Sequence, residues 1–168
     1  MIKYGNNTAV KSNPGTFSIS MFEVISKGVS SAIAARQTRN KAYRKNALAI
    51  HKRLKDWIEK GNPNVAHLDA FLDGQFAAMA GKKFAAIKSL QVSIVIAARG
   101  GLLLDAALFS ECFGEYLLEI GDPHEAAFRL REAIKYYGEF GALRKTRMLE
   151  EKHDNLWPKP AFVTATRY

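Results

Sequence analysis

The segment EIGDPHEAAFRLREAIKYYGEFG, residues 119–141, has the pattern of one helix between two tight turns. Its small and apolar residues recur at intervals of three and four, the spacing at which side chains share one helix face. Asp122 is suited to cap the start of a helix, and Pro123 suits the first turn. Gly121 and Gly141 stand where a glycine just past a helix end takes the left-handed conformation cheaply. The segment therefore predicts a helix over 122–140.

Glycines in the same position recur along the chain at steps of about 20 residues. Each follows a stretch with helical periodicity, so each interval is interpreted as one helix and one tight turn. Two of these turns continue into a proline, Pro63 and Pro123, which suits the start of the next helix. The recurring glycines are Gly61, Gly81, Gly100 with Gly101, Gly121 and Gly141.

Two windows 40 residues apart, starting at Asp73 and Phe113, share a framework of small and apolar residues. The opening segment is therefore one copy of a repeated unit. Repeats of this size predict stacked helical hairpins, none of which can bury its apolar face alone. The paired positions are Gly74 with Gly114, Gly81 with Gly121, Ala86 with Ala126, Leu90 with Leu130, Ser93 with Ala133 and Ile94 with Ile134.

The chain is predicted to be all-α, a right-handed α-solenoid of about three stacked helical hairpins with a capping helix. A flexible N-terminal arm is expected over 1–17, the helical repeat domain over 18–153, and an extended C-terminal tail over 154–168. The aromatic residues of the tail, Trp157, Phe162 and Tyr168, are expected to anchor it either on the last helices or on another protein. Helices are expected over 18–37, 41–60, 64–80, 83–99, 102–120, 122–140 and 142–153.

Six positions of the second window have a spacing that resembles the tetratricopeptide repeat: Gly114, Gly121, Asp122, Glu125, Ala126 and Ala133. The first window carries a weaker version in Gly74, Gly81 and Ala86. Ser110 stands where that repeat usually has tryptophan, and Gly138 replaces its final proline.

A longer stretch, roughly residues 20 to 155, is similar to the tetratricopeptide-type helical region of large multidomain signalling proteins. In those proteins an ATPase is flanked by kinase, sensor or cyclase domains. The resemblance implies a regulatory or partner-sensing module, and it carries over no catalytic function because the kinase and ATPase parts are absent from this sequence. Whether the sequence is a whole protein or part of a multidomain chain stays open.

Glu111, Glu115 and Glu119 follow one another at i, i+4 and i+8, which places them on one helix face. In a tetratricopeptide array they would face the concave groove, with Phe71, Gln75 and Met79 as the corresponding residues of the preceding repeat. An acidic, partly apolar groove would suit a basic or amphipathic peptide. An ordinary solvated stripe paired with nearby basic residues is an equally open interpretation.

The formal net charge of +9 raises the question of nucleic acid, because basic residues crowd the segment 36–60. A basic patch would comprise Arg36, Arg39, Lys41, Arg44, Lys45, Lys52, Arg53 and Lys55. Solvated helix faces are the favoured interpretation, because no recognition motif accompanies the charges. No stretch is apolar enough over about 20 residues to cross a membrane. An intracellular, cytoplasmic protein is expected by default, or an organellar one if the N-terminal arm is a transit segment.

No catalytic residues, cofactor or metal site are predicted. The sequence has no Walker loop, dinucleotide fingerprint or nucleophile elbow. The four histidines lie on different predicted helices without i, i+4 partners, and Cys112 is expected to be a buried small hydrophobe. The favoured function is a non-catalytic protein–protein interaction module, a scaffold or assembly subunit that binds partner protein through its concave face and termini. A nucleic-acid-binding helical repeat that uses the basic segment is the alternative, and an enzyme with a scattered site is a third.

Overall fold

The computed structural model describes residues 14–157, with side-chain positions from residue 26 onward. This part of the chain holds seven α-helices and two short 3-10 helices, so the expected all-α class is confirmed. The helices are α1 (Pro14–Thr38), α2 (Lys41–Glu59), α3 (Ala66–Met79), α4 (Lys83–Arg99), α5 (Leu103–Glu119), α6 (Pro123–Phe140) and α7 (Leu143–Lys152). The 3-10 helices are η1 (Pro63–Val65) and η2 (Asp154–Leu156).

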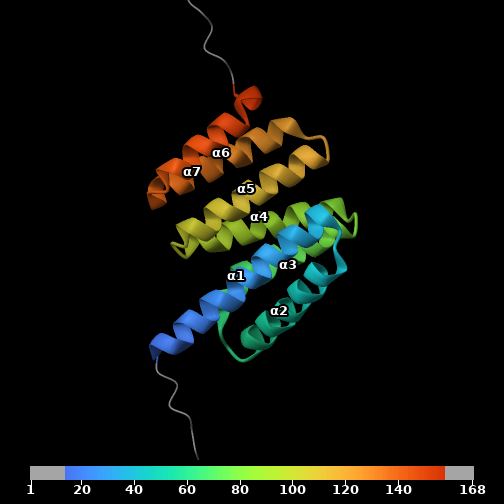
Figure 1. Ribbon diagram of the computed structural model, residues 1–168, viewed down its shortest axis with the longest axis vertical. Helices are drawn as coiled ribbons and strands as arrows, with labels where there is room; N and C mark the ends of the chain where they lie inside the picture. Colours follow the sequence, from blue (N-terminus) through green and yellow to red (C-terminus); the bar gives the residue numbers. More distant parts are fainter. Residues whose placement is uncertain (1–13, 158–168) are drawn as a thin grey trace, which may run out of the picture.

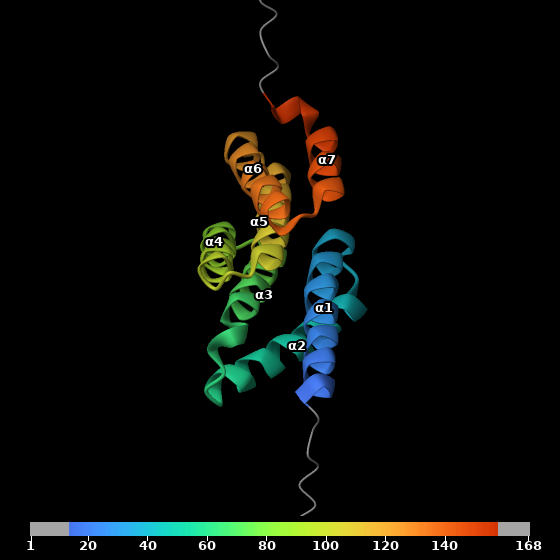
Figure 2. The same cartoon turned by 90° about the vertical axis from the view of Figure 1, so that its left-hand side faces the viewer.

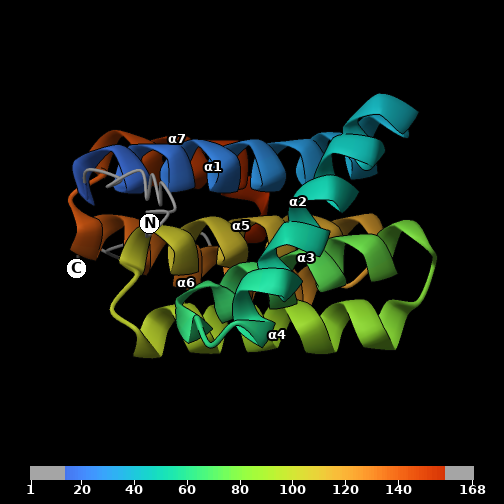
Figure 3. The same ribbon diagram turned by 90° about the horizontal axis from the view of Figure 1, so that it is seen from below.

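The helices pack in consecutive pairs, α1 with α2, α3 with α4 and α5 with α6, as the repeat predicts. From α3 to α6 they follow one another along the long axis of the molecule, and α7 lies beside α6 (Figures 1 and 2). α1 and α7 lie on the same side of α3 and α5, and α4 lies on the opposite side (Figures 2 and 3). The molecule is therefore more than a row of hairpins, because its first and last helices both lie against the face formed by α3 and α5.

Five successive turns use the same hydrogen-bonded helix ending. At the turn after α5, Gly121 takes a positive φ of 80° and donates its backbone N–H to Leu118, while Asp122 donates to Leu117. This is the Schellman arrangement, in which a residue in the left-handed region satisfies carbonyls at the helix end. The same pair of bonds recurs at steps of 20 residues, donated by Asn62, Lys82, Leu102, Asp122 and Ala142 and by the glycine before each of them.

The turn between α1 and α2 has a different construction. Arg39 takes the positive φ there, 58°, in a place without a glycine. Asn40 then caps α2 by accepting the backbone N–H of Ala42 on its side chain, at 2.8 Å. Non-glycine residues rarely adopt this conformation. The turn keeps a residue with positive φ but not the hydrogen bonds of the other turns, because Arg39 donates its backbone N–H to Ala35 and Asn40 donates to the Thr38 side chain.

Within two hairpins the helices approach closely at equivalent glycines. A Cβ on Gly74 would lie 2.7 Å from Leu90 Cγ, and a Cβ on Gly114 would lie 2.7 Å from Leu130 Cγ. Both leucines are fully buried, and so are the small residues that pack beside them, Ala86, Ser93, Ala126 and Ala133. The two hairpins are thus copies of one packing unit, 40 residues apart.

Two helix starts differ from expectation. α1 begins at Pro14 and not at residue 18, and η1 occupies the start of the helix expected over 64–80, with Val65 buried. Residues 1–13 of the expected arm and 158–168 of the expected tail lie outside the described residues. Trp157 contacts the last helices, because its Nε1 donates to Glu150 O at 3.0 Å and its ring lies 5.3 Å from the Arg131 guanidinium.

Candidate functional surface

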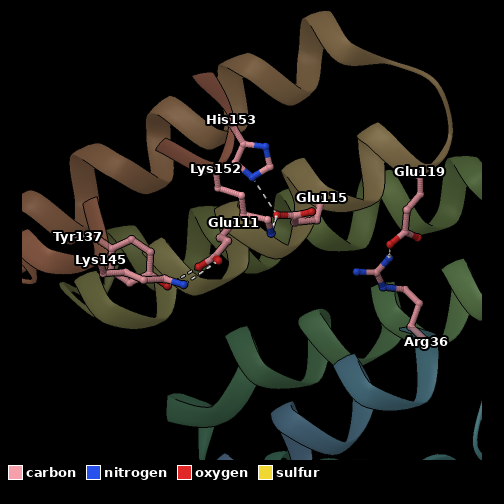
Figure 4. A network of polar contacts seen from close by, with 8 residues as sticks. All are labelled: Arg36, Glu111, Glu115, Glu119, Tyr137, Lys145, Lys152 and His153. Atoms are coloured by element: carbon pink, nitrogen blue, oxygen red, sulfur yellow. Dashed lines mark hydrogen bonds and ion pairs between the residues drawn. The ribbon is translucent and has the colours of Figure 1, made fainter. Parts of the chain in front are cut away.

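The face of α5 that carries Glu111, Glu115 and Glu119 is the face on which α1 and α7 pack, and Figure 4 shows the three carboxylates along it. Two of them turn toward α6 and α7, and the third turns toward α1. Because the three glutamates are each one helical turn apart, their carboxylates lie in a row along α5. Those of Glu111 and Glu115 contact α7 and the residue after it, and that of Glu119 contacts α1.

Glu111 joins α5 to α6 and α7. Its carboxylate accepts a hydrogen bond from Tyr137 Oη at 2.8 Å and forms an ion pair with Lys145 Nζ at 2.8 Å. Burial, together with the neighbouring Glu111 charge, raises the pKa of Tyr137, so the phenol stays protonated and acts as the donor. The Lys145 ammonium also lies 5.7 Å from the Tyr137 ring centre.

Glu115 fixes the end of α7. Its Oε1 accepts from Lys152 Nζ and from His153 Nε2, the latter at 3.0 Å, and His153 is buried. Burial opposes ionisation of Glu115, but the hydrogen bond and charge of Lys152, with a contribution from His153, lower its pKa below the ordinary value. The carboxylate is therefore held in the charged state that docks α7.

Glu119 pairs with Arg36 of α1. The Arg36 side chain is 3% exposed, whereas the Glu119 side chain is 49% exposed. Arg36 Nε also donates to Gln75 Oε1 of α3 at 2.9 Å, and its guanidinium lies 5.7 Å from the Tyr116 ring centre. Arg36 thus joins three helices from a buried position.

The expected groove residues of α3 lie in a different environment from the one predicted. Phe71 is buried and stacks on Phe109 at a ring distance of 4.2 Å, and Gln75 is buried beneath Arg36. Met79 is partly exposed, and its carbonyl accepts from Arg39 Nη1 at 3.1 Å. The cause is the packing of other helices on this face of α3: Phe109 of α5 covers Phe71, and Arg36 of α1 covers Gln75.

Seven of the eight residues of the expected basic patch are exposed, and Arg36 is the exception. Arg36 is buried, Arg39 bonds to the Met79 carbonyl, and Lys55 pairs with Asp69 and Asp73. Arg53 lies over the Trp57 ring at 4.9 Å. Arg39, Arg53 and Lys55 remain exposed despite these contacts, and so do the four basic residues of α2 without such a contact: Lys41, Arg44, Lys45 and Lys52.

Three of the four histidines lie beside carboxylates from other helices, a feature that the sequence did not predict. His67 Nε2 is 3.0 Å from Asp105 Oδ2, His153 meets Glu115, and His51 lies between Asp69 and Asp73. His124 is exposed at the start of α6. These contacts join residues at least 18 positions apart, so spacing along one helix could not have indicated them.

Cys112 is buried on α5, as expected for a small hydrophobe. Burial raises the pKa of its thiol to about 12, with a further contribution from the Glu111 charge. A thiol with so high a pKa is a poor nucleophile at neutral pH, because thiolate is the reactive species.

A cavity of about 780 Å³ opens between α1, η1, α3, the end of α4 and the start of α5. Most of its lining is apolar, and the His67–Asp105 pair stands in its wall. Leu102 and Leu104 lie at its rim, each 41% exposed. The principal apolar residues of the lining are Val29, Ile33, Leu68, Leu102, Leu104 and Leu108.

A cavity of this size, apolar with a few polar groups, is typical of sites that take apolar side chains or small ligands. Sequence reasoning missed it, because its lining comes from three stretches that are distant in the chain, residues 26–33, 63–68 and 96–108, together with Tyr137 of α6. One signal for the cavity is present in the sequence, the run Leu102, Leu103 and Leu104. Three consecutive residues at a helix start cannot all lie on one buried face, so some of this apolar surface is exposed.

Comparisons with family models, with curated proteins and with solved structures found no match. None of the helices in residues 14–157 is long and apolar enough to cross a membrane.

Proposed function

We propose that this chain is a non-catalytic protein–protein interaction module of the tetratricopeptide type, a scaffold or assembly subunit that takes an apolar segment of a partner into the cavity between α1, α3 and α5. The consecutive hairpins and the 40-residue packing unit support the tetratricopeptide assignment, and right-handed stacking is part of the same proposal. The cavity with its exposed leucine rim is the single observation that carries the choice of surface.

The glutamates of α5 support a structural role for that helix face. Glu111, Glu115 and Glu119 are each paired inside the molecule, so a partner that bound there would have to break ion pairs with α1 or α7. Binding in the cavity would break no ion pair, because Leu102 and Leu104 already expose apolar surface to solvent. An apolar or amphipathic helix of the partner would bury that surface, which is the usual source of affinity in helix recognition.

Leu104→Asp tests the cavity with little risk to folding. Leu104 lies in the first turn of α5, where an added carboxylate is favourable for the helix dipole. Leu143→Asp is the matched control, because Leu143 lies in the first turn of α7, is 59% exposed and stands outside the cavity. We expect affinity capture from native lysate, after nuclease treatment and at high salt, to retain a stoichiometric partner with the wild type and Leu143→Asp and to lose it with Leu104→Asp. Retention by all three proteins would contradict the cavity as the binding surface.

A second candidate function, nucleic-acid binding, is favoured by one observation on α2. Lys41, Lys45 and Lys52 are exposed and recur at i, i+4 and i+11, close to one line along the helix. Phosphate contacts by such a stripe would release counterions, so the affinity would fall steeply as salt rises. We expect the double variant Lys41→Glu, Lys45→Glu to abolish any binding of labelled single-stranded or duplex RNA, and equal binding by the wild type and variant would contradict this candidate.

A further inference from the structure

His51, Asp69 and Asp73 bring three ligand atoms together between α2 and α3. His51 Nε2 lies 3.0 Å from Asp69 Oδ1 and 3.2 Å from Asp73 Oδ1, and all three ligand atoms lie within 4.8 Å of one another. Asp69 and Asp73 are one helical turn apart on α3, so both carboxylates lie on the same helix face. The cluster joins the first hairpin to the second.

The imidazole of His51 is buried without a hydrogen bond from Nε2. The residue is 8% exposed, and its ring lies 5.3 Å from the Phe76 ring. Although Asp69 Oδ1 is within 3.0 Å, neither it nor His51 Nε2 has a hydrogen-bond partner, so the two are not aligned for an N–H···O bond. Buried polar atoms in native proteins are rarely left without a bonding partner. A ligand that contacts both His51 Nε2 and Asp69 Oδ1 would satisfy the two atoms.

Both nitrogen–oxygen distances lie within hydrogen-bond range, so it is the missing alignment, and not the separation, that favours a shared ion over a direct bond. Zinc bonds of about 2.0–2.2 Å to nitrogen and oxygen in a tetrahedron place neighbouring ligand atoms about 3.3 Å apart. The two nitrogen–oxygen distances, 3.0 and 3.2 Å, are close to that edge. In a hydrogen bond the acceptor lies on the line of the N–H bond. When Nε2 binds an ion, the ion lies on that line and the other ligands of the ion lie to either side of it.

Lys55 supplies the charge that balances the two carboxylates. Its Nζ lies 3.2 Å from Asp69 Oδ1 and 3.6 Å from Asp73 Oδ2, and its side chain is 47% exposed. The ammonium is therefore able to swing into solvent when another cation takes its place, because its long stem has several rotatable bonds.

We propose that His51, Asp69 and Asp73 bind one divalent transition-metal ion of the Zn²⁺ class, through Nε2 and one oxygen of each carboxylate, and that the ion displaces Lys55. Imidazole with two carboxylates suits Zn²⁺ and not Mg²⁺, which prefers an all-oxygen shell. Three protein ligands leave a fourth position open to water. The ion ties α2 to α3 and so fixes the first hairpin against the second. The site is independent of the cavity proposed for partner binding.

The test is a calorimetric titration of the full chain, treated with chelator beforehand, with ZnCl₂ and separately with MgCl₂. We expect saturable binding of about one Zn²⁺ ion per chain and no binding of Mg²⁺. Asp73→Asn and His51→Gln should weaken Zn²⁺ binding at least tenfold, and Lys55→Ala should tighten it. His124→Ala is the matched control, because it removes an exposed histidine outside the cluster, and its titration should equal that of the wild type.

Circular dichroism melting without metal shows whether each variant folds. Asp73→Asn keeps the test decisive if His51→Gln unfolds, because Asp73 is the most exposed of the three ligands. A shift of the His51 ring nitrogen signal in the NMR spectrum on Zn²⁺ addition is expected as the direct sign of ligation. Absence of saturable binding by the wild type, or equal binding by the wild type and Asp73→Asn, would overturn the proposal. Unchanged affinity in Lys55→Ala would overturn the exchange between Lys55 and the ion.

Discussion

Gly114 of α5 lies directly against the side chain of Leu130 of α6, so close that a Cβ on the glycine would stand 2.7 Å from Leu130 Cγ. Leu130 is fully buried, and the Ala126 carbonyl closes the site on the other side at 3.3 Å from the same Cβ. Neither neighbour can withdraw without moving α6. The close approach of the two helices therefore depends on the absence of a side chain at this one position.

Gly114→Ala tests this contact. We expect it to lower the free energy of unfolding by about 1–3 kcal/mol, because the added methyl group overpacks a buried contact. Gly138→Ala is the control: its Cβ would meet nothing nearer than Thr146 Cγ2 at 4.0 Å, and alanine favours a helix interior. Urea unfolding of the two variants measures the difference. A Gly114→Ala protein as stable as Gly138→Ala would contradict the close packing of α5 and α6.

Arg36 and Glu119 should contribute unequally to stability although they form one ion pair. Arg36→Ala leaves buried Gln75 Oε1 without its donor and opens space beneath α1, so we expect a loss of about 2–3 kcal/mol. Glu119→Gln removes a half-exposed charge that solvent screens, and we expect a loss of about 1 kcal/mol or less. Denaturant unfolding of both variants gives the order of the two effects. Equal losses would mean that Arg36 stabilises through the ion pair alone, because Arg36→Ala removes the pair together with the buried contacts, and a larger loss in Glu119→Gln would contradict the expected order.

The contact between Glu115 and α7 should be sensitive to acid. The pKa of Glu115 is lower in the folded protein than its ordinary value of 4.5, so the carboxylate stabilises the fold above that value. The contribution is lost as the pH falls through the lowered pKa. We expect Glu115→Gln to cost about 1 kcal/mol at neutral pH and progressively less as the pH falls below 4.5.

Urea unfolding of wild type and Glu115→Gln over a pH series measures this contribution. Glu139→Gln is the control, because the Glu139 carboxylate forms a looser pair with Lys135, 3.8 Å away, on the exposed surface of α6. A difference between wild type and Glu115→Gln that stays constant with pH would show that the charge of Glu115 does not dock α7.

Cys112 should be inert in the folded protein. Burial raises its pKa to about 12, and a thiol reagent also needs access that the buried side chain does not give. We expect the reaction of Cys112 with a thiol-specific chromogenic reagent at mildly alkaline pH to be slower than in denaturant by about a hundredfold or more. Equal rates in the two conditions would mean that α5 is not packed as described.

The sequence predicts the helices and their pairing well where the signal is local. The Schellman turn at Gly121 depends on one glycine and its neighbours, so its period can be counted in the sequence. The comparison of the two windows 40 residues apart identifies Gly114 and Leu130 as framework positions, and the structure places them in contact. The turn at Arg39 has no such signal, because an arginine there takes the conformation that glycine takes elsewhere.

The environment of the expected groove residues on α3 could not be predicted, because helices that are distant in the sequence cover them. Phe71 and Gln75 would line a groove if α3 were covered only by its own hairpin, but Phe109 of α5 and Arg36 of α1 cover them. One signal pointed to this contact: Arg36 follows Val29 and Ala32 at i+7 and i+4, on the face of α1 that is buried. A basic residue on an apolar face indicates a buried partner, and Gln75 with Glu119 supplies it.

The most direct measurement of the proposed function is a methyl NMR spectrum of the full chain, with labelled leucine, valine and isoleucine, recorded with and without a captured partner. Leu104 and Leu108 report on the cavity, and Leu48, exposed on α2 near Lys45, reports on the basic stripe. We expect the partner to shift the signals of Leu104 and Leu108 and to leave Leu48 unchanged. A shift confined to Leu48, with the cavity signals unmoved, would contradict binding in the cavity and favour recognition through the basic face of α2.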